Sequence, residues 1–330
     1  MGGPGGTVER CTVILTPRDL FSVTEECLGH LFRNTPEPFD LIIALGGAPA
    51  DLRRRLEAAF TGKARLIFTP GFMNTAQLRN LALKEVGTRL AVALDTNVFV
   101  RPGWLTALIR CQQETGASLV VPLILDRDDR IHTAGNDLFI THERGAAYGS
   151  MELRFQHQRV CETTNLVRRE VDFGEVHCEL VVTDDAVRLG IYDERLREGS
   201  DIDSGLTLSR AGRTMMFEPT SVVYLHYPPL IRAAEDVPFH RWKWDIPAVM
   251  ESYRYMQEKW QIDVGGPRAD FKRYLVGVNA RVGALTQLYP SRGTIFVDRL
   301  VRYLGERMPS LASVRRRFTA WRVGYYREGP

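Results

Sequence analysis

The chain of 330 residues has few cysteines and no long apolar run. Its five cysteines are odd in number, widely spaced and without a CxxC pair, which argues against a disulfide framework or a zinc ribbon and favours a reducing compartment. No segment approaches the roughly 18 apolar residues that a membrane-spanning helix needs. Residues 1–10 lack an apolar signal core, so we interpret them as a flexible lead-in to a soluble, cytoplasmic protein.

An excess of one charge is also missing, because 43 Lys and Arg stand against 40 Asp and Glu, a net charge of +3. This balance gives no reason to expect a nucleic-acid partner. The charge is unevenly distributed, since residues 267–330 contain thirteen basic and four acidic side chains. The sequence therefore predicts a basic tail on a mildly acidic body.

A glycine-rich turn does not follow the first predicted strand, residues 11–16. The glycines at positions 2–6 precede that strand, and Pro17-Arg18-Asp19 follows it. Nicotinamide dehydrogenases carry their glycine-rich turn directly after the first strand. A sugar nucleotidyltransferase would have a glycine-rich, basic loop at the same place, so both classes are excluded.

Apolar runs alternate with helical patterns through the first hundred residues, which is typical of a doubly wound, mostly parallel α/β sheet. Beyond them we expect polar, irregular chain at 135–151 and a proline-bearing link near 227–238. The predicted strands are 11–16, 39–45, 64–68, 90–94, 119–125, 180–182, 215–217 and 222–225. The predicted helices are 21–33, 51–60, 74–86, 184–189, 202–211 and 239–260.

The buried strand at 90–94 ends in the polar cluster Asp95-Thr96-Asn97, and Arg101-Pro102-Gly103-Trp104 then opens a helix. Ligands of α/β sheets gather at the carboxyl ends of the strands. A carboxylate at such an end either caps the next turn or belongs to a site.

This whole stretch resembles the family-2 (GT-A) glycosyltransferases, whose short acidic DxD signature follows an apolar strand and precedes a Pro-Gly-Trp-Leu helix start. Here Asn97 replaces the last carboxylate. Matches in the same order extend from residue 11 to 226. The resemblance implies a GT-A-like, Rossmann-like sheet flanked by helices. It further implies a lead-in at 1–10, a catalytic domain at 11–228 and a helical, basic C-terminal extension at 229–330.

The resemblance also implies which residues grip the nucleotide-sugar donor. Thr16-Pro17-Arg18 resembles the family's turn after the first strand, and the segment NTAQLRN, from Asn74 to Asn80, resembles its N-G-x-x-x-x-R-N element. A cap role for Asn74 and a solvated Arg79 remain the alternative. Leu45-Gly46-Gly47-Ala48 stands where the family has an Asp that contacts the base. The implied donor-binding residues are Thr16, Pro17, Arg18, Asn74, Arg79, Asp95 and Thr96.

A divalent cation, Mg²⁺ or Mn²⁺, is implied at Asp95, Asn97 and His226. Such cations prefer carboxylate and phosphate oxygens, so an amide at position 97 predicts weaker metal binding. Three interpretations stay open: a weakened site completed by the donor's phosphates, a metal-free site that uses arginine, and a degenerate site. His226 taken alone is also compatible with a core histidine.

The general base implied by the resemblance is Asp201, in a segment similar to the family's E-D-x-D-L-x-x-R-L-x-x-A-G, with Ser200 in place of the usual Glu. A general base takes the proton of the acceptor hydroxyl as that oxygen attacks. Alternatively, Ser200, Asp201 and Asp203 only cap a helix and favour its dipole. On the acceptor side the resemblance implies Glu179 and Asp193.

The function that follows is transfer of a sugar from a nucleoside-diphosphate sugar to an acceptor hydroxyl, by an inverting mechanism. The acceptor would be a carbohydrate, a lipid-linked sugar or a small molecule. The alternative is a catalytically degenerate, nucleotide-sugar-binding or scaffold protein. In the tail, Arg315-Arg316-Arg317 with nearby aromatic residues predicts a solvated helix, a homodimer face or peripheral contact with the inner face of a membrane.

Overall fold

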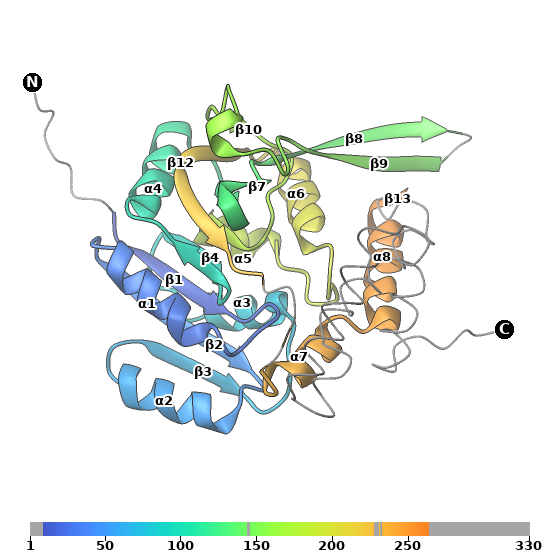
Figure 1. Ribbon diagram of the computed structural model, residues 1–330. Coiled ribbons are helices and arrows are strands. Elements are labelled where there is room, and N and C mark those ends of the chain that lie inside the picture. The colour runs from blue at the N-terminus through green and yellow to red at the C-terminus, as the bar shows by residue number, and fades with distance from the viewer. Residues whose placement is uncertain (1–8, 144–145, 228–230, 232, 264–330) are drawn as a thin grey trace, which may run out of the picture.

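The computed structural model describes residues 9–143, 146–227, 231 and 233–263. A central sheet has helices on both of its faces (Figure 1). Its strands are β1 (Cys11–Thr16), β2 (Phe39–Gly46), β3 (Arg65–Thr69), β4 (Leu90–Asp95), β5 (Val98–Val100), β6 (Leu119–Leu125), β7 (Ile131–Thr133), β10 (Arg169–Glu170), β11 (Cys178–Val182) and β12 (Met215–Leu225). The helices are α1 (Thr24–Asn34), α2 (Ala50–Phe60), α3 (Thr75–Leu83), α4 (Trp104–Thr115), α5 (Thr183–Leu189), α6 (Ser200–Arg210), α7 (Asp236–Lys243) and α8 (Ile246–Trp260).

The main strands are buried on both faces because helices cover each side of the sheet. In β1, Val13 and Leu15 pack into the same cluster as α1, α2 and α4. Ile14, which points to the other face, packs with α3, α5 and α6. Successive side chains of a strand point in opposite directions, so an unbroken apolar run is what a strand between two helical layers requires.

The sheet order is β10-β12-β6-β11-β4-β1-β2-β3, with β5 beside β12 and β7 beside β6. Strands β3, β2, β1 and β4 are parallel, as are β6 and β12. Strand β11 runs antiparallel between β4 and β6. The predicted α/β class with helices on both faces is confirmed, and the antiparallel β11 brings the residues before it to the carboxyl end of β4.

The prediction of irregular chain at 135–151 is wrong. Strands β8 (Asn136–Glu143) and β9 (Ala146–Leu153) form an antiparallel hairpin that extends from the body, and β13 (Ile262–Asp263) pairs with β9 (Figure 1). Phe139 and Tyr148 are 49% and 44% exposed. Because much of the hairpin is exposed, its residues do not alternate between apolar and polar as those of a half-buried strand do.

The single helix predicted at 239–260 is two helices, α7 and α8. Asp245 caps α8 by accepting a hydrogen bond from the Ala248 amide at 3.1 Å, and a proline follows in the first turn. Proline lacks the amide hydrogen that a continuous helix needs, so it favours a new start. Among the described residues, no helix combines the length and apolar character that crossing a membrane requires.

Helices α7 and α8 pack against the α/β body. Asp236 accepts hydrogen bonds from the amides of Phe21 and Ser22, and the Trp244 indole donates to Asp19 at 2.5 Å. The domain boundary at residue 228 stays a prediction. The basic pattern at 315–317 lies outside the described residues.

Candidate functional site

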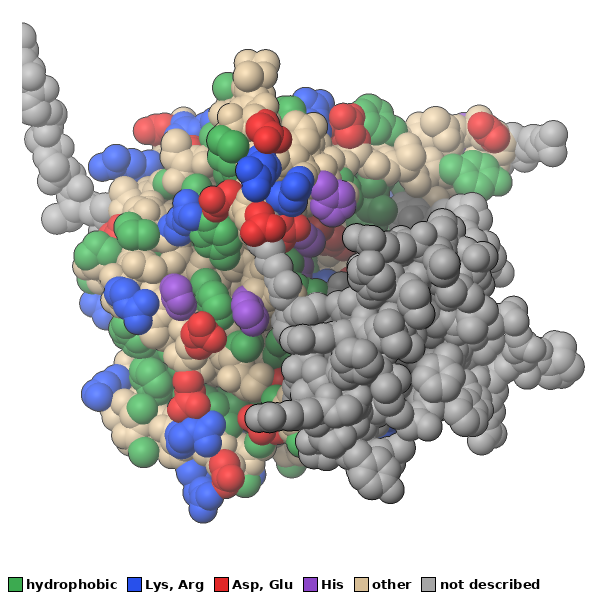
Figure 2. Space-filling model, viewed as in Figure 1, with side chains coloured by type: hydrophobic (Ala, Val, Ile, Leu, Met, Phe, Trp, Pro, Cys, Tyr) green, Lys and Arg blue, Asp and Glu red, His purple; other side chains and the backbone are tan. Residues whose placement is uncertain are grey.

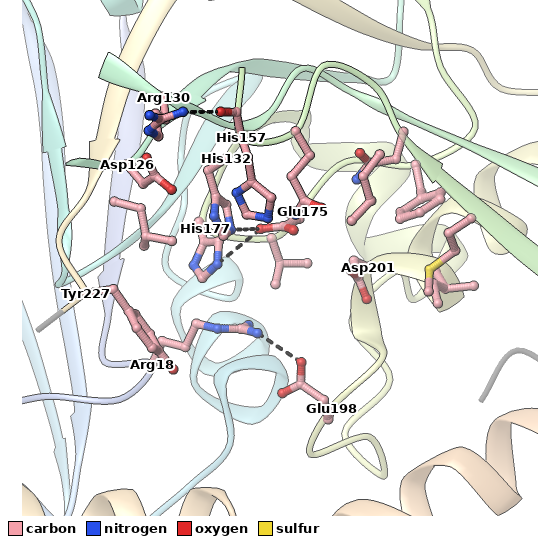
Figure 3. Close-up of a pocket in the computed structure, with 18 of the residues that line it drawn as sticks. Arg18, Asp126, Arg130, His132, His157, Glu175, His177, Glu198, Asp201 and Tyr227 are labelled. Atoms are coloured by element: carbon pink, nitrogen blue, oxygen red, sulfur yellow. Dashed lines mark hydrogen bonds and ion pairs between the residues drawn. The ribbon is translucent and has the colours of Figure 1, made fainter. Parts of the chain in front are cut away.

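A cavity of about 740 Å³ lies at the end of the sheet where β1 and β6 finish (Figure 3). Charged and histidine side chains gather near the base of the β8–β9 hairpin (Figure 2). The polar lining comes from segments far apart in the sequence: the turn after β1, the turn after β6, strand β7, the turn after β9, the segment before β11 and the start of α6. The charged residues and histidines of the lining are Arg18, Asp126, Asp128, Arg130, His132, His157, Glu175, His177, Glu198 and Asp201.

Asp95, at the end of β4, is completely buried behind the wall of this cavity. One of its carboxylate oxygens accepts a hydrogen bond from Arg79 at 3.1 Å. The other lies 3.0 Å from Nδ1 of His177, which does line the cavity. Asp95 is therefore linked to the cavity by its contact with His177 and does not line the cavity itself.

Arg79 lies on α3, and only 1% of its side chain is exposed. Besides Asp95, it donates to Glu179 at 2.9 Å and to the Val176 carbonyl at 2.5 Å. The Tyr192 hydroxyl donates to the same Glu179 oxygen at 2.8 Å. Burial raises the pKa of Glu179 despite the guanidinium, and neither Arg79 nor Glu179 lines the cavity.

Asn74 has the cap role that the sequence left open. Its side chain accepts from the Gln77 amide at 2.8 Å, and Gln77 completes a capping box at the start of α3. Its amide group donates to the Glu194 carbonyl, also at 2.8 Å. Asp193, predicted on the acceptor side, accepts from Tyr255 and Lys259 and so ties the segment before α6 to α8.

The remaining residues of the predicted donor and metal site surround Asp95. The His226 amide donates to the Asn97 carbonyl at 2.7 Å, so these two residues are adjacent. The Asn97 side chain is buried and has no hydrogen-bond partner in the described part of the chain. Thr96 donates to the Leu20 carbonyl, while Thr16 is completely buried at the end of β1. Pro17, next in the chain, is buried too.

Asp201 lies in the first turn of α6 and lines the cavity together with Arg18 (Figure 3). Burial raises the pKa of Asp201 to about 6, with the carboxylates of Glu198 and Glu175 adding to the effect and Arg18 opposing it. Arg18 donates to Glu198 at 3.0 Å, and Lys243 donates to the other oxygen of Glu198 at 2.9 Å. Burial opposes ionisation of Glu198, but the two cations lower its pKa to about 2.

A cluster of His132, Glu175 and His177 was missed by the sequence analysis. Glu175 Oε2 lies 2.8 Å from Nε2 of His132 and 3.3 Å from Nε2 of His177. Burial opposes ionisation of Glu175, yet the two imidazoles hold its pKa well below the usual range. Burial and Arg18 lower the pKa of His177, but hydrogen bonds to Asp95 and Glu175 raise it to about 8. The only local signal was Glu-Val-His, whose alternate residues share a face when extended.

The sheet and the polar residues that follow β1 and β4 define a domain of the GT-A type. Residues 14–174, just under half of the chain, match the family model described as glycosyl transferase family 2. The resemblance seen in the sequence is therefore confirmed. No curated protein matches the chain.

Two solved structures show a similar chain trace. One is GalNAc-T7 with UDP, GalNAc and Mn²⁺, at 14% identity and a TM-score of 0.50, covering 82% of this chain and 55% of that chain. The other is the mannosyltransferase PcManGT from Pyrobaculum calidifontis with GDP-Man and Mn²⁺, at 12% identity and a TM-score of 0.47, covering 96% and 86%. The chain thus spans about half the length of the GalNAc-T7 chain. At 14% identity, the first likeness concerns the fold alone.

Proposed function

We propose that the protein transfers a sugar from a nucleoside-diphosphate sugar to an acceptor hydroxyl, with inversion and with Asp201 as general base. The observation that carries this proposal is that Asp201 and Arg18 line one cavity. Arg18 lies in the turn after β1, where the family resemblance puts the donor, and Asp201 lies in the first turn of α6. The match of residues 14–174 to the glycosyl transferase family 2 model supports the class of reaction.

Each residue has a defined task in this reaction. The Arg18 guanidinium offsets the charge of the donor's diphosphate, because its planar donors match phosphate oxygens. Glu198 holds Arg18 in place. Asp201 accepts the acceptor's hydroxyl proton while the oxygen forms a bond to the anomeric carbon, and the diphosphate leaves with the electron pair of the broken carbon–oxygen bond.

A divalent cation, Mg²⁺ or Mn²⁺, would supply further positive charge at the diphosphate. The predicted ligands Asp95, Asn97 and His226 fit it poorly, because Arg79 and His177 already engage both carboxylate oxygens of Asp95. Asn97 brings a neutral amide with no partner among the described residues, and a hard cation prefers charged oxygen ligands. The proposed reaction therefore does not use a metal ion at these three residues.

A second candidate function is a protein that binds nucleotide-sugars without turnover. It is favoured by the enclosure of Asp95, together with Asn97 and Ser200 at positions where the family has acidic residues. Under this alternative the cavity would bind a nucleotide or nucleotide-sugar, and no product would form.

The first test screens nucleoside diphosphates and nucleoside-diphosphate sugars by thermal shift, with and without Mn²⁺. The second test measures release of nucleoside diphosphate from the sugar donors in the presence of a panel of acceptors. Transfer predicts stabilisation by one donor class and product formed only when an acceptor is present. Binding with no release by any acceptor would support the non-catalytic alternative. A cytoplasmic location, a homodimer and membrane contact through the C-terminal region at 229–330 stay predictions.

The acid side of the pH profile follows from the raised pKa of Asp201. A base must be ionised to accept a proton, so kcat/KM should fall about tenfold per pH unit below about pH 6 and level off above it. The measurement is the initial transfer rate at acceptor concentrations well below KM from pH 4.5 to 8, with the folded fraction checked at each pH. An acid limb centred near pH 4, or one that persists in Asp201→Asn, would contradict the assignment.

A further inference from the structure

Two histidines and a glutamate converge on one wall of the cavity, outside the positions that resemble the glycosyltransferase signature. His132 comes from β7, while Glu175 and His177 lie just before β11. One ligand atom from each residue can be chosen so that all three atoms lie within 4.8 Å of one another. Figure 3 shows the three side chains facing one another at the cavity wall.

The spacing of these atoms is close to that of a metal site. Bonds of about 2.0–2.2 Å from a cation to nitrogen and oxygen put neighbouring ligand atoms of a tetrahedral site about 3.3 Å apart. Glu175 Oε2 lies 2.8 Å from one imidazole nitrogen and 3.3 Å from the other. These two distances already suit a bound cation, and the chosen nitrogens of His132 and His177 lie within 4.8 Å of each other.

Asp95 provides an independent indication. Its buried carboxylate contacts Nδ1 of His177 at 3.0 Å, and this leaves Nε2 to face Glu175 and the cavity. Histidines that bind metals commonly donate their other ring N–H to a carboxylate, which orients the ring and makes it a better ligand. Arg79 in turn holds Asp95 by an ion pair.

We propose that His132, Glu175 and His177 bind a divalent transition-metal ion, with Zn²⁺, Co²⁺ and Mn²⁺ preferred to Mg²⁺. Imidazole ligands suit transition metals, whereas Mg²⁺ favours an all-oxygen shell. Three protein ligands beside a cavity leave coordination positions for water or for an oxygen of a bound substrate. Asp95 acts as a positioning residue for His177.

The metal site itself does not depend on the proposed function, although contact of its ion with a donor phosphate or acceptor hydroxyl would rest on it. The two can fail separately. Metal binding without transfer by any donor would leave the site intact and reject the transferase. Sugar transfer by a protein that binds no metal at these residues would support the transferase and reject the metal site.

The experiment uses the full chain after treatment with a chelator. Titration calorimetry with Zn²⁺ and with Mg²⁺ measures affinity, and visible absorption with Co²⁺ reports nitrogen ligands and coordination number. We expect one Zn²⁺ per chain, bound at least about 100-fold more tightly than Mg²⁺. The variants His132→Ala and Glu175→Gln should each weaken Zn²⁺ binding by about 100-fold or more and remove the Co²⁺ absorption.

Two histidine variants serve as matched controls. His142→Ala changes an exposed histidine of β8, and His226→Ala changes the histidine of the position predicted from the family signature. Both should bind Zn²⁺ as the unchanged protein does. Asp95→Asn should keep the Co²⁺ absorption but lower affinity about 10–100-fold, a pattern that general destabilisation would not produce.

The proposal is overturned if chelator-treated protein binds no transition metal. It is also overturned if folded His132→Ala and Glu175→Gln bind Zn²⁺ normally, or if His226→Ala abolishes binding while they retain it. Circular dichroism and thermal unfolding establish that each variant is folded. Of the three residues, His132 has the most exposed side chain, at 25%, so replacing His132 should disturb the core least.

Discussion

Replacing Asp201 with asparagine is expected to lower kcat for sugar transfer about 10²–10⁴-fold, the usual contribution of a general base. The amide has nearly the same shape as the carboxylate but cannot accept the hydroxyl proton. Asp201 lies in the first turn of α6, whose N-cap is Gly199 with no side-chain cap hydrogen bond, so asparagine at position 201 removes no cap. A loss of kcat with unchanged stability would therefore separate proton transfer from capping.

The measurement is steady-state transfer with the donor identified by the thermal-shift panel, together with the dissociation constant for that donor. Donor affinity should change little, since Arg18 and not Asp201 faces the diphosphate in the proposed arrangement. Asp184→Asn is the matched control, because it alters an exposed carboxylate in the first turn of α5. If Asp201→Asn keeps kcat within about threefold of the unchanged enzyme, Asp201 is not the base.

Replacing Arg79 with methionine is expected to destabilise the protein by about 3–5 kcal/mol. The guanidinium is 1% exposed and pairs with two completely buried carboxylates, those of Asp95 and Glu179. Methionine fills much of the same volume but removes the guanidinium from both carboxylates, which, within the described part of the chain, leaves Glu179 without a cation and Asp95 with His177 alone. Breaking a buried pair in this way costs more than the pair contributes, because an uncompensated charge remains in the core.

Urea unfolding followed by fluorescence and circular dichroism measures this change. Arg54→Met is the control, since Arg54 pairs with Asp51 at the surface with 75% of its side chain exposed, and its loss should leave the unfolding midpoint unchanged. The sequence alone predicted that Arg79 binds the donor's phosphates. An Arg79→Met variant of normal stability that no longer binds donor would restore that prediction.

Much of the fold follows from patterns within short segments of the sequence. The apolar runs at β1 and β4 specify strands buried on both faces, and the turn residues after them specify where each strand ends. In the same way, the acidic cluster at 201–203 marks the first turn of a helix. These features depend on neighbours a few residues away, so local propensity and periodicity are enough to predict them.

Which side chains meet at the site depends on the order of the strands in the sheet. Strand β11 enters antiparallel between β4 and β6, and this brings Glu179 to Arg79 and His177 to Asp95. His132 and Glu175 are 43 positions apart, and no local pattern relates them.

The sequence by itself determined an α/β sheet of the GT-A type. It also placed Asp95 at the end of the fourth strand and Asp201 in the first turn of a later helix. Only the tertiary structure decided that Asp95 is buried behind His177, whereas Asp201 lines the cavity. The reason is that periodicity encodes which face of an element is buried, whereas strand pairing between distant segments determines which polar side chains meet there.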